Sequence, residues 1–448
     1  MKFLFALLLL LPSALGAQTR PTAPTTPDDR YKADLLVVVA HPDDEGAVSS
    51  YIARILDEGK RVAVVYGTRG SSGSNQYGPE HAAALGDIRE IEARKAWATL
   101  GVTNVWFLDG NDTASQDVLN SLAHWGHGQA LEKMVRVFRL TRPDVVMTFF
   151  PGVFIGENHG DHQAAGVIAT EAFDLAGDPS VFPSQVAGAM YRLEPYLENL
   201  RPWQASKIYY FAYGNHESEY ASSGPTYSVK GISKSSHKPY WVLAVEAFAS
   251  HMTQSAAYIN SFKGLTEAEL EKKAAEDGWS DDQHFVLGKS LVGGKATDDV
   301  FANIAQAASA SKNTESVLIL GGPWDFYDHF RRAHSLGQMP QIDVPEIAVE
   351  AGKMLEIPLV LQNSGNQAEE ISLAVHLPPG WPLQSGTQSF SLAAGSTITT
   401  TVEITLPALE SGSTETKPSE VSVDAMSGGQ RVGSVRLRVE LRKRALPQ

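Results

Sequence analysis

The sequence of 448 residues contains no cysteine. This excludes disulfide bonds and thiolate metal ligands, and it leaves no cysteine for lipidation at a cleavage site. Any metal site in this chain must therefore use histidine and carboxylate ligands. Such ligands suit Zn²⁺, and another divalent first-row metal would also be possible, because these donors do not choose sharply among them.

Basic residues are also few. The chain has 37 Lys and Arg against 51 Asp and Glu, which gives a formal net charge of −14 at pH 7. Nucleic-acid-binding proteins usually concentrate positive charge to meet the phosphate backbone. We therefore expect no nucleic-acid partner.

The apolar block near the N-terminus is too short to span a membrane, which takes roughly 20 apolar residues. One basic residue, Lys2, precedes it, and small residues follow near positions 14 to 17, which is typical of a signal peptide. We predict cleavage after residues 1–17, a secreted or periplasmic location, and no transmembrane anchor after cleavage. Residues 18–32, rich in Thr, Pro and Asp, are predicted to be a disordered linker.

The stretch from Leu35 to Glu45 joins an apolar run to a polar motif. Residues 35–40 favour a strand buried on both faces of a parallel sheet, and such sheets bind ligands beyond the carboxyl ends of their strands. Pro42 disfavours helical backbone at the preceding residue, so His41 should end the strand. The three acidic residues that follow should then enter the first turn of the next helix.

Strand-like and helix-like segments alternate through the first half of the chain. This alternation predicts an α/β domain, residues 33–338, with a Rossmann-like, doubly wound, mostly parallel sheet. The expected strands are 35–40, 62–66, 105–108 and 144–150, and the expected helices include the apolar positions from 48 to 55 and the ranges 80–100, 118–140 and 163–173.

A second polar motif, Glu157–His162, follows the strand 144–150. Asp161 is placed to cap the helix that begins after it. His41 and His162 both lie where a strand passes into a helix at the same edge of the sheet. We therefore expect these two distant histidines to converge on one ion.

His41, Asp44 and His162 would give a zinc ion two imidazoles and one carboxylate, and leave a position for water. Asp43, adjacent but not a ligand, is the natural acceptor of the proton from that water. Each motif alone is most often structural, as a strand-ending turn or a solvated loop. Their joint occurrence favours a site, because neither junction needs a histidine.

His159 remains after the metal ligands are assigned. With Asp161 to orient it, a protonated His159 would stabilise the oxyanion of a tetrahedral intermediate and later protonate the leaving amine.

Other candidates have two open interpretations. Arg69 lies in the Gly/Ser loop 67–78, which lacks the Walker spacing, and is either a substrate contact or a surface cation. Asp109 and Asp112 are substrate contacts or turn formers. His251 would line the substrate pocket or cap its wall.

From residue 342 onward the sequence alternates between apolar and polar residues, as at 355–362, 371–377 and 400–406. Short alternating strands predict an Ig-like β-sandwich, residues 339–448. Residues 177–320 would complete the α/β domain or cover its site. We therefore assign the strand-like segments 207–213 and 316–321 to that domain.

The polar motifs resemble those of the PIG-L/LmbE family of zinc-dependent deacetylases, which act on N-acetylglucosaminyl compounds. The similarity covers roughly residues 34 to 260. The matching segments are Ala40–Glu45, Thr68–Gly70, Leu85–Glu92, Leu100–Val102, Phe107–Asp109, His159–His162 and His251–Gln254.

The resemblance implies residue roles that agree with the chemistry above. They are His41, Asp44 and His162 as metal ligands, Asp43 as general base, His159 as electrophilic or acid catalyst, and Arg69 and Asp109 near the sugar. Some members carry a tyrosine where this chain has Glu157. The C-terminal part resembles Ig-like domains appended to secreted carbohydrate-active enzymes.

Together these observations predict an exported zinc-dependent hydrolase that removes an N-acetyl or other N-acyl group from an amino sugar or glycoconjugate. The sandwich would contact glycan or another protein. Two alternatives remain open at this point: an amidase acting on a bulkier acyl or peptide-like conjugate, and a non-catalytic cell-surface glycan-binding protein.

Overall fold

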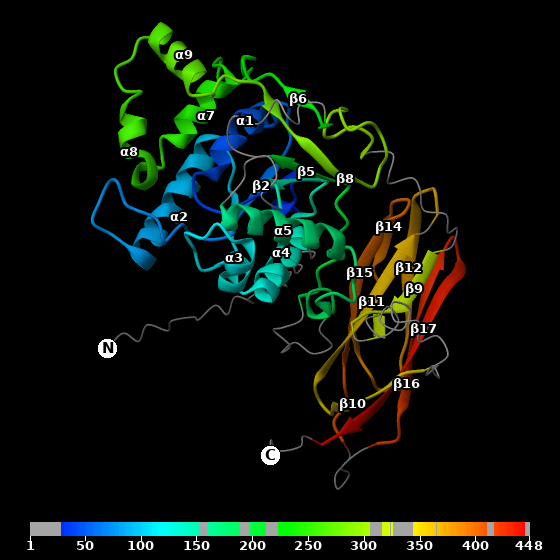
Figure 1. The fold of residues 1–448 in the computed structure, drawn as a ribbon. Helices are drawn as coiled ribbons and strands as arrows, with labels where there is room; N and C mark the ends of the chain where they lie inside the picture. Colours follow the sequence, from blue (N-terminus) through cyan, green and yellow to red (C-terminus); the bar gives the residue numbers. More distant parts are fainter. Residues whose placement is uncertain are drawn as a thin grey trace, which may run out of the picture.

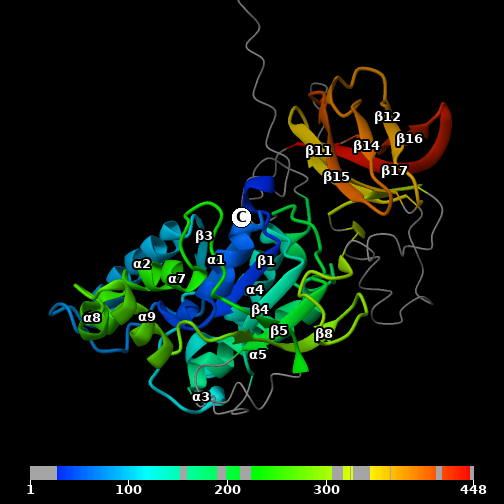
Figure 2. The ribbon, with the colours of Figure 1, turned by 90° about the horizontal axis from the view of Figure 1, so that it is seen from above.

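The computed structural model shows an α/β domain and a β-sandwich lying side by side (Figures 1 and 2). The predicted signal peptide and residues 18–27 of the predicted linker lie outside the described residues, whereas residues 28–32 of that linker are described and include a 3₁₀ turn. Within the described part, no helix combines the length and apolar character needed to cross a membrane. The structure describes residues 28–151, 159–188, 198–211, 223–304, 316–322, 324–325, 344–363, 365–409 and 416–443.

The α/β domain is built on a six-stranded sheet of order β3-β2-β1-β4-β5-β8. The first five strands are parallel, and only β8 is antiparallel. This confirms the predicted Rossmann-like, mostly parallel sheet. The strands are β1 (Leu35–Val39), β2 (Val62–Tyr66), β3 (Asn104–Phe107), β4 (Val145–Phe149), β5 (Lys207–Phe211) and β8 (Val286–Ser290).

Helices cover both faces of this sheet because successive residues of a strand face opposite sides. Leu36 and Val38 of β1 pack with α3 (Val118–Trp125), α4 (His127–Thr141) and α5 (Gly160–Leu175). Leu35, Val37 and Val39 pack with α1 (Ser49–Asp57) and α2 (Ala82–Thr99). All five residues of β1 are buried, as expected for the central strand.

Two local predictions need correction. The helix predicted over 118–140 is two helices, because Gly126 between them adopts a left-handed φ of 66°. The acidic residues after Pro42 enter a short 3₁₀ helix, η2 (Asp44–Ala47), which precedes α1.

Among the remaining elements of the domain, helices α7 and α8 pack on the α1 and α2 side of the sheet, whereas η4 contacts α4 on the other side. Helix α7 packs against both α1 and α2. The elements are α7 (Tyr240–Phe248), α8 (Met252–Asn260), α9 (Glu267–Glu276), the short strands β6 (Thr226–Tyr227) and β7 (Gln283–His284), and the 3₁₀ turns η1 (Asp29–Tyr31) and η4 (Pro183–Gln185).

The sandwich consists of two sheets, with strand orders β10-β17-β16-β12-β14 and β13-β15-β11-β9. Their inward-facing apolar residues form one core. The strands are β9 (Ser316–Leu320), β10 (Glu346–Glu350), β11 (Met354–Asn363), β12 (Glu369–His376), β13 (Leu383–Ser385), β14 (Ser389–Leu392), β15 (Thr397–Thr405), β16 (Ser419–Ser427) and β17 (Gln430–Arg442).

Strand β9 corrects the assignment of 316–321 to the α/β domain. It pairs antiparallel with β11, with Leu320 opposite Leu359. A short apolar strand has the same local pattern in either sheet, so its own sequence does not reveal its partner. The sandwich therefore includes a strand that precedes the predicted boundary at 338/339, and that boundary lies outside the described residues.

Candidate functional site

The two histidine motifs meet where the strand order of the sheet reverses. β1 and β4 are neighbours, and the polar segments after them lie at the carboxyl ends of these strands. His41 follows β1, whereas His159 precedes α5 and His162 lies in the first turn of that helix. The ring centroid of His41 is 4.9 Å from that of His159 and 5.2 Å from that of His162. A crevice at this switch point is the usual ligand site of such sheets.

The Asp44 carboxylate lies between two imidazoles. Its Oδ1 is 3.1 Å from Nε2 of His162, and its Oδ2 is 3.4 Å from Nδ1 of His41. Oδ2 also accepts hydrogen bonds from the backbone amides of Ala40 (3.0 Å) and His41 (2.7 Å). Burial would raise the pKa of Asp44, but His162 and His41 hold it well below its usual range. Asp44 is therefore an ionised, oriented ligand candidate.

His41, Asp44 and His162 supply donors of the chemical type that zinc uses. Tetrahedral zinc ligands lie about 3.3 Å apart, and the two carboxylate oxygens of Asp44 each lie near one histidine, Oδ1 near His162 and Oδ2 near His41. Ring nitrogens of His41, His159 and His162 also lie within 4.8 Å of one another. A second group of close donor atoms joins His41 to Asp112 and Asp161, so the cluster offers nitrogen and oxygen donors of the type that zinc uses.

Two further carboxylates orient His41 from its other side. Its Nε2 is 3.1 Å from Oδ1 of Asp112 and 3.4 Å from Oδ2 of Asp161. Burial alone would lower the pKa of His41, but the carboxylates of Asp44, Asp112 and Asp161 raise it well above the usual value. A carboxylate behind a metal-ligating histidine fixes the orientation of its ring.

The role predicted for Asp161 as a helix cap is wrong. The helix begins at Gly160, so Asp161 lies inside its first turn, and His159 is the N-cap residue. The Asp161 carboxylate instead accepts from the amide (3.0 Å) and the hydroxyl (2.8 Å) of Thr113. It therefore ties the loop after β3 to the site.

Asp112 is a functional candidate that sequence reasoning treated only as a substrate contact or a turn former. Its Oδ1 accepts from Thr68 Oγ1 (3.0 Å), and its Oδ2 accepts from both the amide and the hydroxyl of Ser72 (2.6 Å each). Its position in the sequence could have indicated this role, because Asp112 follows β3, whose carboxyl end lies at the same edge of the sheet as His41.

Asp43 sits beside the ligand candidates in a strained conformation, with a φ of 129° that favours glycine. Burial, followed by the negative charge of Asp44, raises the pKa of Asp43 to about 7, against the lowering effect of His251. Its amide donates to Oε2 of Glu45 at 3.0 Å. This hydrogen bond to Glu45 stabilises the strained backbone of Asp43.

Glu45 is the centre of a buried network that sequence analysis did not anticipate. Oε2 also accepts from the hydroxyl of Tyr66 (2.7 Å), and Oε1 lies 2.6 Å from Nε2 of His251. The Tyr66 hydroxyl in turn accepts from Nε1 of Trp97 (2.8 Å). His251 is 0% exposed, so its side chain has no free surface for the substrate contact we predicted. It instead contacts Glu45 and helps to position that carboxylate.

His159 has a lowered pKa, first because of burial and then because of His41 and His162. The neutral imidazole is therefore favoured, whereas the predicted acid role assumes a protonated one. A neutral imidazole can still donate one hydrogen bond to an oxyanion. Glu157 lies outside the described residues.

Arg69 and Asp109 form an ion pair at the edge of the sheet. Nη1 of Arg69 bonds Asp109 (2.5 Å), and its Nε bonds Glu90 (2.6 Å). Asp109 also bonds Nζ of Lys133 at 2.6 Å. Arg69 and Asp109 border a hollow of about 420 Å³ beside β3, with the ring of Phe107 under the guanidinium. The structure thus brings the two predicted substrate contacts, Arg69 and Asp109, together beside the loop that contains Asp112.

Fold and site together define an α/β protein with a partly buried His/Asp cluster at the switch point of a Rossmann-like sheet. Residues 36–173 match the PIG-L family, described as GlcNAc-PI de-N-acetylase, and residues 349–423 match the NPCBM-associated NEW3 domain of alpha-galactosidase. A relative from a Nocardioides strain is 31% identical over 242 residues, which are 47% of this chain and 74% of the relative. The chain belongs to the PIG-L family.

That relative is named as a 1D-myo-inositol 2-acetamido-2-deoxy-alpha-D-glucopyranoside deacetylase. A protein of the same name from Streptomyces scabiei is 32% identical over 203 residues, which are 42% of this chain and 58% of the relative. Among solved structures, an N,N'-diacetylchitobiose deacetylase from Pyrococcus horikoshii is similar with a TM-score of 0.38 and 20% identity, covering 57% of this chain and 84% of that one. The chain spans about 60% of the length of several of the curated relatives it matches.

Proposed function

We propose that this protein is a zinc-dependent hydrolase that removes an N-acetyl group from an amino sugar or glycoconjugate. The observation that carries the proposal is the Asp44 carboxylate held between the imidazoles of His41 and His162, with Asp43 beside it. These residues would hold the ion. A bound zinc ion supplies Lewis acidity, which lowers the pKa of water and polarises a carbonyl group.

The side chains around the site would carry out proton transfer and stabilise the oxyanion. Asp43 accepts the proton of the attacking water, a task suited to a carboxylate whose pKa lies near neutrality. His159 donates a hydrogen bond to the oxyanion that develops on the amide carbon. As the carbon–nitrogen bond breaks, the proton taken up by Asp43 passes to the leaving amine, and acetate and a free amine result.

An amino-sugar substrate is supported by the names of the relatives, which describe deacetylases of an acetamido-glucopyranoside. Arg69 and Asp109 would contact the sugar from the edge beside β3. An enzyme specialised for a bulkier acyl group would instead release amine from larger amides and little acetate from N-acetyl sugars.

The proposal extends to export, which the N-terminal apolar block supports. Expression of the full chain in a bacterial host, followed by cell fractionation and N-terminal sequencing, tests it. A mature protein in the periplasm or medium that begins near residue 18 is expected. Uncleaved protein in the cytoplasm would refute export, and it would leave the hydrolase proposal unaffected.

The decisive experiment follows acetate and free amine released from N-acetylglucosaminyl inositol and from N,N'-diacetylchitobiose by zinc-loaded protein. We expect both products in equal amounts, and Asp43→Asn should lower kcat by about 10²- to 10⁴-fold while zinc content stays the same. Asp282→Asn, an exposed change, is the matched control. Undiminished hydrolysis by zinc-loaded Asp43→Asn would exclude Asp43 as the base, and no release by the unaltered protein would refute deacetylation.

A further inference from the structure

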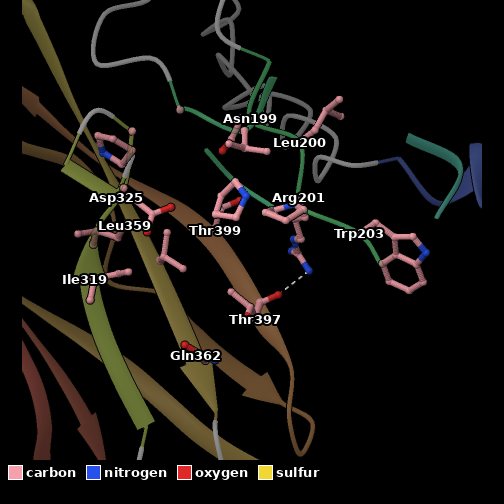
Figure 3. Close-up of a pocket in the computed structure, with 18 of the residues that line it drawn as sticks. Asn199, Leu200, Arg201, Trp203, Ile319, Asp325, Leu359, Gln362, Thr397 and Thr399 are labelled. Carbon is pink, nitrogen blue, oxygen red and sulfur yellow. Dashed lines mark hydrogen bonds between the residues drawn. The ribbon is translucent and has the colours of Figure 1, made fainter. Parts of the chain in front are cut away.

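A second hollow, of about 490 Å³, lies between the α/β domain and the sandwich (Figure 3). From the α/β domain, Arg142 just before β4, Gly177 after α5 and Trp203 before β5 border it. From the sandwich, Leu359 of β11 and Thr397 of β15 do so. Because β4 and β5 begin here, the hollow lies at the opposite edge of the sheet from the His/Asp cluster. It is a separate place from the proposed catalytic site.

Two guanidinium groups of this hollow have unused donors. Arg201 donates from Nη1 to the carbonyl of Thr397 at 2.7 Å, which links the two domains (Figure 3). Arg142 bonds Asp29 from Nη2 at 2.9 Å. The Nε atoms of both arginines are buried, and neither has a hydrogen-bond partner within the part of the chain that the structure describes. Leaving a buried N–H without an acceptor costs free energy, so an incoming acceptor would be favoured.

The charges around the hollow also favour an anion. Asp29 compensates the charge of Arg142 through their ion pair. Arg201 forms no ion pair within the residues that the structure describes, so its positive charge is the one open to an incoming anion. Burial, and after it the positive charge of Arg142, lowers the pKa of Arg201, while Asp29 acts in the opposite direction. A carboxylate or phosphate would supply the missing acceptors and match the planar donor fork of arginine.

The other lining residues suit a ring that is apolar on one side and hydroxylated at its rim. Ile319 and Leu359 offer aliphatic surface, whereas Asn199, Gln362 and Thr399 offer amide and hydroxyl groups (Figure 3). Ligand sites commonly lie at domain interfaces and combine apolar walls with a few polar groups. We propose that this hollow binds a sugar carrying an oxyanion, either a carboxylate or a phosphate.

Isothermal titration calorimetry of the full-length protein tests this proposal with glucuronate, glucose 6-phosphate, glucose and inorganic phosphate. We expect saturable binding of at least one acidic sugar, about tenfold or more tighter than glucose. Tighter binding of glucuronate would identify a carboxylate site, and tighter binding of glucose 6-phosphate a phosphate site. No saturable binding of either acidic sugar, or equal affinity for inorganic phosphate alone, would overturn the proposal.

Substitutions locate the binding. Arg201→Gln and Arg142→Gln should each weaken it about tenfold or more, while Arg431→Gln, an exposed change on the sandwich, should leave it unchanged. Circular dichroism of each variant reports whether the fold is retained. Unaltered affinity in the folded arginine variants would place the ligand elsewhere and refute the assignment. Because no hydrolysis is measured, the result is independent of the proposed deacetylase activity.

Discussion

The Glu45 carboxylate and the His251 imidazole, 206 positions apart in the chain, lie 2.6 Å apart in the buried interior. Glu45 also holds the amide of Asp43, whose backbone is strained. The segment after α7 is thereby linked to the proposed general base through one carboxylate. Burial would lower the pKa of His251, but Glu45 raises it, so the pair behaves as a charge-assisted hydrogen bond.

The first prediction concerns this network. Glu45→Ala leaves Asp43, Tyr66 and His251 without their shared acceptor and should lower kcat by about 10- to 100-fold, because small displacements of a catalytic group are costly. KM and zinc content should change little. Glu45→Gln should recover part of kcat, since its amide oxygen can still accept from Asp43. Steady-state kinetics with metal analysis measure this, and Glu271→Ala on exposed α9 serves as the control.

Loss of zinc from Glu45→Ala, with kcat per bound zinc unchanged, would contradict the positioning role. It would show that Glu45 acts on the ligands and not on Asp43.

The second prediction concerns Asp112, which lies 3.1 Å from His41 Nε2. Asp112→Ala removes the carboxylate that orients this ring and should weaken zinc binding by about 10- to 100-fold. Competition with a chromophoric chelator measures the affinity, with Asp282→Ala as the control. An unchanged affinity would mean that Asp161 alone fixes the His41 ring.

The third prediction is a dependence of stability on pH through Asp57. Its carboxylate accepts from the amide of Lys234 (2.7 Å) and from Ser235 and Ser233. These bonds hold the pKa of Asp57 well below its usual range. Since the folded value lies below the unfolded value of about 3.9, the stabilisation is present above that pH and is lost as pH falls through it toward the folded value.

Urea unfolding between about pH 6 and pH 3 measures this contribution. Asp57→Asn should be less stable than the unaltered protein at pH 6, and the difference should shrink at low pH. Asp281→Asn, an exposed change, should show no such convergence. A gap that stays constant with pH would exclude ionised Asp57 as its source.

The sequence by itself determined the α/β class, because buried apolar runs and helical periodicities are local properties of the chain. The run at Leu35–Val39 and the histidines at strand-to-helix junctions could be recognised without coordinates. The α/β alternation also implied parallel strands, whose carboxyl ends share one edge of the sheet, so His41 and His162 could be expected there together.

Only the tertiary structure decided which distant groups meet. Nothing local to Asp112, Glu45 or His251 identifies its partner, since each lies in a different segment and the contacts arise from the packing of loops and α7 around the sheet. The same holds for β9, whose apolar pattern would fit either domain and whose pairing with β11 assigns it to the sandwich. Periodicity reports which face of an element is buried, whereas partners depend on how separate elements are brought together.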